Sequence, residues 1–475
     1  MERNISDLHV VVFPWSAFGH MIPFYQLAIA LAKKGVRISY ISTPKNIKRL
    51  PNIPSELNSL VEYVSIPLPT TPDGGGVPEG AEATVDIQFH EIPYLKVAYD
   101  LLYEPIKKFV SSRSIDWIIS DIIGHRMADL ARECHIQLMF FSVYTATTLS
   151  FVGPPEYLSE EGRKKVRPTP DSLTTPPPWG GGIFPPSVAF RGYEAAGFHP
   201  GIYNKNESGI SDAERLATMI KGCDAVGVRS CREFEGEYID LYQKLINKPV
   251  VPVGLLPPPK VEKKEENTDE TWIEVFKWLD QQSNRSVIYV GFGSEYKLTK
   301  DEVYEIAYGL ELAQLPFIWA LRKPTWAVDD SEALPPGFVD RTSGKGTVCL
   351  GWAPQLKVLA HPSVGGSLFH SGWGSIIETL EHGHNLVLLP FIIDQGLNAR
   401  MIVEKGLGIE VDRREDGSYT RDDIASALKQ AMVGDEARKI KARAKQAAEI
   451  FGDHKLQEEQ YINGLVEFLR TGAGH

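Results

Sequence analysis

The sequence has few cysteines, no long apolar run and no basic block, and each absence excludes a class of protein. Only four of its 475 residues are cysteine, and they are widely spread. A disulfide scaffold or a cysteine-rich metal centre is therefore excluded, and we expect buried free thiols. No uninterrupted apolar run reaches the roughly 18 residues that a membrane span needs. The start, MERNISDLHVVVFPW, lacks a cationic segment before an apolar core, which predicts a cytoplasmic protein.

Charge and motif content exclude further classes. The formal net charge is -11 and lysine and arginine do not cluster, so we expect no nucleic-acid partner. The phosphate-loop pattern GxxxxGK[ST] is absent. The segment GFGSEY at 291–296 lacks the third glycine of a dinucleotide fingerprint, so a nicotinamide dehydrogenase is only weakly supported.

Short β-branched segments alternate with helical patterns along both halves of the chain. This rhythm predicts an α/β fold with two Rossmann-like, doubly wound parallel sheets, because one core rarely supports so long a chain. We expect a ligand crevice at the carboxyl ends of the strands. The predicted strands are 8–14, 36–43, 116–121, 136–142, 286–294, 317–322, 347–352, 367–370 and 386–391.

Composition also marks the expected boundaries. Prolines followed by a charged run at 251–271 predict a linker between an N-terminal domain, 1–250, and a C-terminal domain, 272–455. A final helix, 456–475, is expected to pack back on the N-terminal domain. The Pro- and Gly-rich stretch from about 153 to 210 predicts long loops with little regular structure.

The most specific segment runs from Trp352 to Gln395. Within it the strand SLFH is followed by Ser371-Gly372-Trp373-Gly374, which predicts a tight turn into a helix beginning near Ser375. A helix N-terminus after a glycine-containing turn suits a diphosphate, because it presents amide N–H groups and the positive end of the helix dipole. Taken alone, Ser375 and Glu378 could instead form a simple capping box.

This segment resembles the donor-binding signature of plant secondary-product glycosyltransferases, the plant family-one UDP-dependent enzymes, which opens WxPQ, centres on HCGWNS and closes with DQ. The resemblance extends over nearly the whole chain, from FGHMIPF at 18–24 onward. It implies the GT-B architecture, and a transferase that moves one sugar from a UDP-sugar to a hydroxyl of a small hydrophobic acceptor. A catalytically weak nucleotide-sugar-binding protein is the alternative of another class.

The resemblance also implies a role for each residue of the signature. Trp352 would stack on uracil, Gln355 would bond the nucleoside and Glu378 would accept from the ribose hydroxyls, chemistry that suits each side chain. The remaining implied donor-binding residues are Ser294, Ala353, His370, Trp373, Gly374, Ser375, Asp394 and Gln395. Gly374 replaces the family's usual Asn and Ser371 its usual Cys, while His384-Asn385 replaces a common Val-Pro pair.

His20, expected in a loop from 15 to 21 after the first strand, stands at the position of the family's general base. An imidazole, with an ordinary pKa near 6.5, suits removal of the acceptor's hydroxyl proton. Asp121, at the end of the strand 116–121, is expected to orient it. Asp116 is the competing carboxylate, but it precedes the strand and is expected at the distant end.

Expectations for the other ligands follow from the same resemblance. The sequence has no Asp-x-Asp triplet, which metal-dependent transferases commonly use, so we expect neither metal nor other cofactor. FPWSAFGH and GFGSE resemble the subgroup that adds a sugar to an existing glycoside, with UDP-glucose as the expected donor and UDP-rhamnose as its competitor. Candidate acceptor-binding residues are Trp15, Phe18, Phe89, His90, Tyr144, Thr145 and Phe391.

Overall fold

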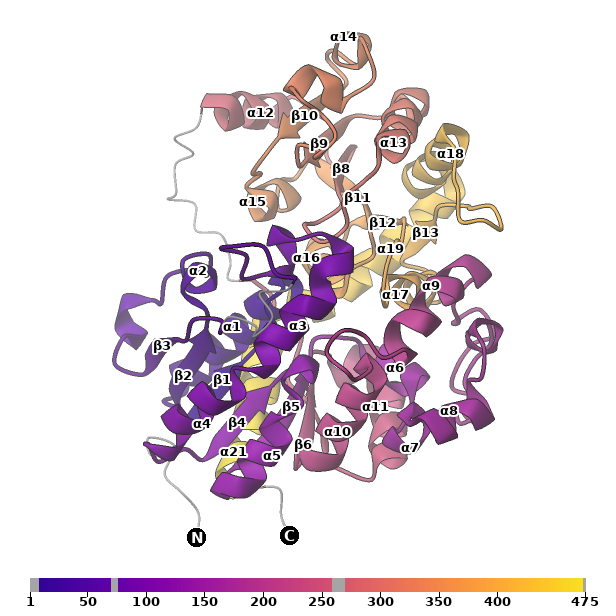
Figure 1. Ribbon diagram of the computed structural model, residues 1–475. Coiled ribbons are helices and arrows are strands. Elements are labelled where there is room, and N and C mark those ends of the chain that lie inside the picture. Colours follow the sequence, from indigo (N-terminus) through magenta and orange to yellow (C-terminus); the bar gives the residue numbers. More distant parts are fainter. Residues whose placement is uncertain (1–7, 70–75, 259–269, 473–475) are drawn as a thin grey trace. The chain divides into compact units, whose positions relative to one another are not determined.

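Two parallel β-sheets organise the protein in the computed structural model, which describes residues 8–69, 76–258 and 270–472 (Figure 1). Most of the predicted linker, 259–269, lies outside the described residues. The chain divides into two compact units. Unit 1 holds the described residues up to Phe184, Ala195–Leu256 and those from His454 onward, and unit 2 holds Pro185–Glu194 and the described residues from Pro257 to Asp453.

The sheet of unit 1 has seven parallel strands in the order β3-β2-β1-β4-β5-β6-β7. The strands are β1 (His9–Phe13), β2 (Arg37–Ser42), β3 (Val61–Ser65), β4 (Trp117–Ser120), β5 (Gln137–Ser142), β6 (Ala225–Val228) and β7 (Val250–Pro252). The helices are α1 (Phe18–Lys33), α2 (Pro44–Ile47), α3 (Ile92–Asp100), α4 (Tyr103–Ser111), α5 (Met127–Cys134), α6 (Ala146–Val152), α7 (Pro155–Leu158), α8 (Glu160–Val166), most of α9 (Gly192–Tyr203), whose first residues up to Glu194 belong to unit 2, α10 (Asp212–Gly222), α11 (Arg232–Ile246), α20 (His454–Leu456) and α21 (Asn463–Thr471). The order of strands reverses between β1 and β4.

The sheet of unit 2 has six parallel strands in the order β10-β9-β8-β11-β12-β13. They are β8 (Val287–Gly291), β9 (Phe317–Leu321), β10 (Gly346–Leu350), β11 (Val364–Phe369), β12 (Asn385–Leu388) and β13 (Gly408–Glu410). The helices are α12 (Glu270–Asp280), α13 (Lys300–Ala313), α14 (Phe338–Arg341), α15 (Gln355–Leu359), α16 (Trp373–Glu381), α17 (Gln395–Glu404), α18 (Arg421–Met432) and α19 (Gly434–Phe451). Here the order reverses between β8 and β11.

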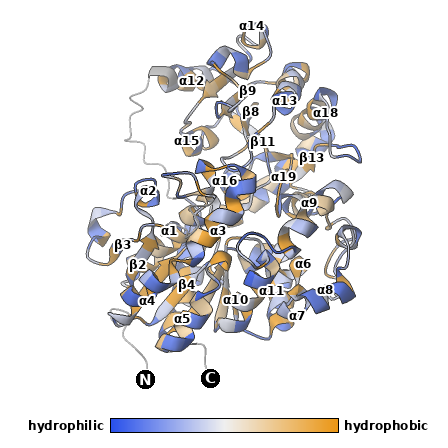
Figure 2. Cartoon of the chain, in the orientation of Figure 1, coloured by the Kyte–Doolittle hydropathy of each residue, from blue (hydrophilic) through white to orange (hydrophobic). Residues whose placement is uncertain are grey.

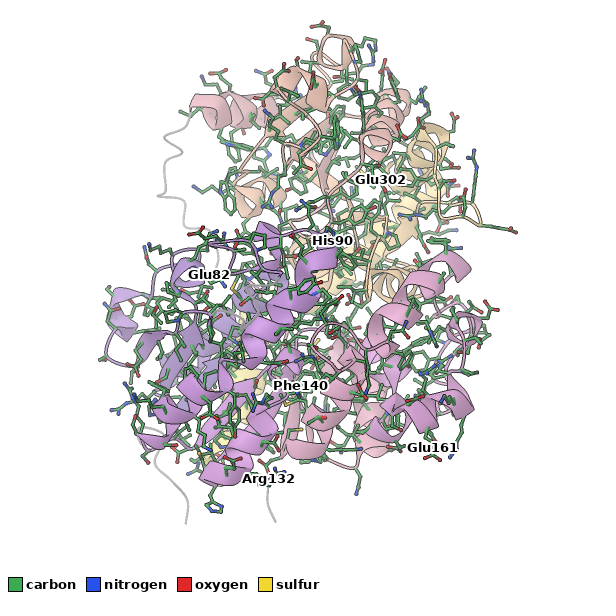
Figure 3. All side chains as sticks on the ribbon, in the orientation of Figure 1. Glu82, His90, Arg132, Phe140, Glu161 and Glu302 are labelled. Carbon is green, nitrogen blue, oxygen red and sulfur yellow. The ribbon has the colours of Figure 1, made fainter. Side chains whose placement is uncertain are left out.

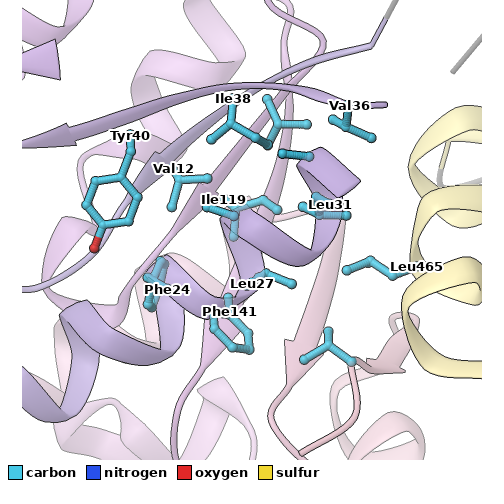
Figure 4. Packing of buried hydrophobic residues seen from close by; sticks show 14 of the residues in the cluster. Val12, Phe24, Leu27, Leu31, Val36, Ile38, Tyr40, Ile119, Phe141 and Leu465 are labelled. Atoms are coloured by element: carbon cyan, nitrogen blue, oxygen red, sulfur yellow. The ribbon is translucent and has the colours of Figure 1, made fainter. Parts of the chain in front are cut away.

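Each sheet is buried in an apolar core, as all-parallel sheets require. The central strands of unit 1 are strongly hydrophobic (Figure 2), and Phe140 of β5, labelled in Figure 3, is 1% exposed. Leu465 of α21 packs in the same cluster as Val12 of β1 and Leu27 of α1 (Figure 4). The Trp117 indole also donates to the carbonyl of Leu469 at 2.9 Å, so the last helix is part of this core.

The stretch 153–210 contains more regular structure than its composition predicts, and the expectation of long loops was wrong for α7, α8 and α9. The hydroxyl of Ser159 caps α8 by accepting from the amide of Gly162 at 3.2 Å. Ion pairs one turn apart, such as Glu160 with Lys164, then support the helix. These local interactions offset the high proline content nearby.

Residues 185–194, which the sequence assigned to the N-terminal domain, group with unit 2 instead. Arg400 of α17, only 5% exposed, accounts for this attachment. Its guanidinium pairs with Glu194 and also with Glu410 of β13, the latter at 2.8 Å, and donates to the carbonyl of Ala189 at 3.0 Å. A buried charge with these partners holds the segment in place, because removing them would leave it uncompensated.

His384 and Asn385, the departure from the resembled signature noted above, form a buried polar pair. His384 is fully buried, with one ring nitrogen 2.9 Å from the hydroxyl of Ser367 and the other 3.0 Å from the carbonyl of Leu359. The Asn385 amide donates to the carbonyl of Ala431 at 2.6 Å. Burial lowers the pKa of His384 to about 3.

This burial predicts a pH-dependent stability. Below the ordinary imidazole pKa of 6.5 the unfolded chain takes up a proton on His384 that the folded chain does not, until the pH reaches about 3. The free energy of unfolding should therefore fall with falling pH in this window, by about 1.4 kcal/mol per pH unit from this residue. Denaturant unfolding at pH 6.5, 5.5 and 4.5 should show a shallower dependence for His384→Gln than for the unchanged protein. The exposed His135, replaced by Asn, provides the control, and equal slopes in both variants would refute the assignment.

Candidate active site

His20 and Asp121 lie at the carboxyl ends of β1 and β4, the two strands where the order of the first sheet reverses. Parallel α/β sheets bind ligands at this point, because the loops on either side diverge there. His20 Nδ1 is 2.7 Å from Asp121 Oδ2. The structure therefore brings together the two residues that the sequence selected. Asp116 precedes β4 and accepts from the amide of His9, at the start of β1, at 2.9 Å.

His20 lies on a helix and not in the loop that the sequence predicted. Helix α1 begins at Phe18, and its N-cap is Ala17, whose carbonyl accepts from the amide of His20 at 2.9 Å. The first turn of α1 thus fixes the backbone of His20. A histidine on a helical turn is held in a narrower range of orientations than one on a loop, which suits a positioned base.

The carboxylate of Asp121 is itself fixed by the backbone. It is 1% exposed, and it accepts from the amides of Trp15 at 3.2 Å and Ile122 at 2.7 Å. Because a carboxylate only accepts, a neutral His20 must donate from Nδ1, and its Nε2 then carries the lone pair. The pair is therefore arranged for Nε2 to take up a proton, after which Asp121 stabilises the imidazolium.

The candidate acceptor residues of unit 1 fall into two groups. Beside the pair, Tyr144 meets the His20 ring edge-to-face at 5.7 Å, and the ring of Trp15, 5% exposed, meets Tyr99 at 5.0 Å. Phe18 opens α1 and packs against the core of unit 1. Thr145 is fully buried, and its hydroxyl caps α6 by accepting from the amide of Thr148 at 3.1 Å.

The other two candidates lie on a separate element. Phe89 and His90, the latter labelled in Figure 3, form part of the short 3-10 helix η4 (Phe89–Glu91). Both are exposed, and the Phe89 ring is 70% exposed. An exposed aromatic ring of this size is available for an apolar ligand.

The nucleoside-binding candidates lie together in unit 2. Trp352, 88% exposed, presents an aromatic face. Ala353 comes next, just before Pro354, the N-cap of α15. Gln355, at the start of α15, donates from Nε2 to Glu378 Oε2 of α16 at 2.6 Å. The Gln355 amide oxygen accepts from the hydroxyl of Tyr289 at 2.9 Å, and no motif in the sequence marks Tyr289 as this partner.

His370 follows β11 at the reversal point of the second sheet. Burial lowers its pKa to about 4, so the ring is neutral at pH 7 and can offer a diphosphate an N–H but not a positive charge. A Cβ atom on Gly372 would come within 2.5 Å of this ring, and one on Gly293, whose φ is +70°, within 2.9 Å. Both glycines are therefore required by the position of the imidazole.

Helix α16 begins at Trp373, two residues earlier than predicted, with Gly372 as its N-cap. Ser375 therefore lies inside the first turn, which excludes a capping box with Ser375 at the N-cap. Trp373 is 4% exposed and packs edge-to-face on Phe451 at 6.2 Å. Gly374 and Ser375 belong to the turn whose amide N–H groups have no partner within the helix, and these groups can bind an anion.

The sugar-binding candidates lie at the start of α17. Asp394 is its N-cap, and its Oδ2 accepts from Asn398 at 2.8 Å. Gln395 Oε1 accepts from the backbone amides of Phe391 and Ile392, at 2.9 and 3.1 Å. These bonds fix the turn that carries both side chains.

Two more predicted residues lie in unit 2. Phe391 stacks on Tyr296 with ring centroids 4.2 Å apart, and the Arg413 guanidinium lies 5.0 Å from its centroid. Ser294, in the turn after β8, donates to Glu295 at 3.4 Å. The donor-binding candidates therefore follow the carboxyl ends of β8, β10 and β11 or lie in the turn before α17.

Metal-ligand clusters and membrane-spanning helices are both absent from the described ranges. Within residues 8–69, 76–258 and 270–472, no three His, Cys, Asp or Glu side chains are grouped so that they could hold a metal ion. No helix in this part of the chain has both the length and the apolar character for crossing a membrane.

Comparison with known proteins defines the class. A UDP-glucosyltransferase from Polygonum tinctorium capable of glucosylating indoxyl superposes with a TM-score of 0.78 at 24% identity, covering 98% of this chain and 99% of that one. Its likeness shows the fold, the GT-B architecture with two parallel-sheet units. Residues 263–453 match the family described as UDP-glucoronosyl and UDP-glucosyl transferase.

Relatives extend the match to the whole chain. UDP-glycosyltransferase 91A1 of Arabidopsis thaliana is 42% identical over 98% of this chain and 97% of its own length. Soyasaponin III rhamnosyltransferase of Glycine max is 36% identical over 99% of this chain and 97% of its own. The chain belongs to the plant family-one UDP-glycosyltransferases.

Proposed function

We propose that this enzyme transfers glucose from UDP-glucose to a sugar hydroxyl of a small hydrophobic glycoside, with a flavonoid or terpenoid core, and inverts the anomeric centre. The observation that carries the proposal is the 2.7 Å bond between His20 and Asp121 at the reversal point of the first sheet, in a chain of this family. The proposal keeps the cytoplasmic location and the metal-free donor site that the sequence predicts.

The proposed reaction is a single displacement. His20 Nε2 removes the proton of the acceptor hydroxyl as its oxygen attacks the anomeric carbon. The new carbon–oxygen bond forms while the bond to UDP breaks, and UDP leaves with the bonding pair. Attack from the face opposite the leaving group gives inversion.

The leaving diphosphate needs stabilisation, which unit 2 can supply without a metal. The first turn of α16, the neutral His370 and the hydroxyls of Ser294 and Ser375 are the donors that we assign to it. The sugar itself would contact the region of Trp373, Asp394 and Gln395. Gly374 supplies only its backbone amide where the family has an Asn side chain.

UDP-rhamnose is the second candidate donor, and one observation favours it. A relative that is 36% identical is named a rhamnosyltransferase of soyasaponin III. Rhamnose lacks the 6-hydroxyl, so a site that bonds this hydroxyl would discriminate strongly between the two donors.

A turnover assay read by mass spectrometry should separate these possibilities. The purified protein would be incubated with UDP-glucose and UDP-rhamnose in parallel, against flavonoid, diterpenoid and triterpenoid aglycones and their monoglucosides. We expect a mass gain of one hexose on the monoglucosides and not on the aglycones. A deoxyhexose gain would identify rhamnose as the donor, and products on aglycones alone would refute the glycoside acceptor.

A further inference from the structure

Tyr289 of β8 lies 66 positions before Gln355 in the sequence, yet a hydrogen-bonded relay connects it to the donor signature. Its side chain is 4% exposed, and its hydroxyl is 2.9 Å from Gln355 Oε1. Gln355 Nε2 in turn is 2.6 Å from Glu378 Oε2. The relay thus joins a central strand to the first residue of α15 and the middle of α16, all within unit 2.

The chemistry of the last member fixes the direction of the whole relay. A carboxylate only accepts hydrogen bonds, so Gln355 must turn its NH₂ group toward Glu378. Its amide oxygen then faces Tyr289, and the phenol must donate. Burial raises the pKa of Tyr289 well above its ordinary value, so the phenol keeps this proton. No other arrangement satisfies all three groups.

The relay is also accommodated by the backbone beside it. Gly291 lies two residues further along β8, on the same face, and a Cβ atom there would come within 2.9 Å of the Tyr289 hydroxyl oxygen. The absence of a side chain at 291 therefore leaves the phenol its position next to Gln355.

From this geometry we propose that Tyr289 is a positioning residue for ribose recognition: it orients the Gln355 amide, which orients the Glu378 carboxylate toward the ribose diol of the donor. The inference rests on the proposed donor site, in which Glu378 accepts from the ribose hydroxyls. Without the phenol hydroxyl, the Gln355 oxygen loses its buried donor and the amide is free to rotate. Glu378 then loses its fixed orientation.

A binding experiment on the full chain tests this inference without requiring transfer. Titration calorimetry would compare UDP with 2′-deoxy-UDP, which lacks one hydroxyl of the diol. The unchanged protein should prefer UDP, and Tyr289→Phe should reduce this preference by about 5- to 10-fold, the size of one hydrogen bond. Affinity for 2′-deoxy-UDP should fall less, since it offers Glu378 only the 3′-hydroxyl and its base stacking on Trp352 does not use the relay.

Two further variants distinguish positioning from a general loss of packing. Tyr242→Phe removes another buried phenol hydroxyl, one without a hydrogen-bond partner among the described residues, and should leave the preference unchanged. In the Gln355→Ala background, Tyr289→Phe should have no additional effect on the preference, because the relay is already broken. An unchanged preference in Tyr289→Phe, or an additive effect in the double variant, would overturn the inference. Failure of the unchanged protein to bind UDP would instead contradict the proposed function.

Discussion

The His20→Ala variant is expected to lose about 10³-fold in the rate of sugar transfer while it binds UDP as the unchanged protein does. The reason is that alanine cannot accept the hydroxyl proton, whereas the donor-binding residues belong to the other unit. Initial rates measured by mass spectrometry, together with titration of UDP, would check both parts of this expectation.

A second histidine of unit 1 supplies the control. His135 is exposed at the C-cap of α5 in a left-handed backbone conformation, which asparagine tolerates. His135→Asn should therefore keep the full transfer rate. Loss of UDP binding together with transfer in His20→Ala would show that His20 maintains the fold, and full activity would remove it from the mechanism.

The Asp121→Asn variant is expected to lower kcat by about 10³- to 10⁴-fold with little change in the KM for the UDP-sugar. The Asp121 carboxylate accepts from the amide of Trp15 with one oxygen and from the amide of Ile122 with the other. Asparagine has only one side-chain oxygen, so it can keep only one of these two hydrogen bonds. If the new NH₂ group faces His20, it donates to Nδ1 and moves the ring proton to Nε2. His20 then has no lone pair toward the substrate.

A double variant tests whether the two residues act as a unit. Asp121→Asn in the His20→Ala background should cause no further loss of kcat, because Asp121 acts only through the imidazole. A clear additional loss would show that Asp121 has a role independent of His20. Thermal unfolding of each variant would separate either effect from simple destabilisation.

The sequence predicted most of the central strands because those strands are buried, apolar and rich in β-branched residues, as β1 with HVVVF illustrates. It missed one interior strand, the four-residue β6 with AVGV, whose small residues give a weak pattern. It also did not predict β3, β7 or β13, which are edge strands with mixed burial or only three residues. Such strands form because a neighbouring strand offers hydrogen bonds. Their own side chains show too little hydrophobic pattern to predict a strand.

The start of α1 was misplaced for a local reason. Proline is favoured in the first turn of a helix, but α1 begins at Phe18, inside the loop predicted for 15–21, and holds Pro23 in its interior. His20 was therefore expected in a loop. The shift brings His20 into a rigid turn without changing its partner.

Candidate residues were predictable where a linear motif carries them, as with Gln355 and Glu378. Tyr289 was not, because it lies 66 positions before Gln355 and its strand pattern indicates only a buried side chain. Arg400 is similar: its pairing with Glu194 spans 206 positions and depends on the folded chain. Contacts of this kind carry no periodic signal in the sequence.

The attachment of residues 185–194 to unit 2 has a practical consequence for engineering. A chimera that takes its donor-binding unit from a relative would ordinarily have a single junction between the two parent sequences, in the proline-rich segment near 257. In this chain such a cut would separate Arg400 from Glu194 and would give residues 454–472 to the wrong parent. A functional exchange should carry 185–194 together with 257–453 and leave the last helix with its own core, so four junctions are needed where the linear sequence suggests one.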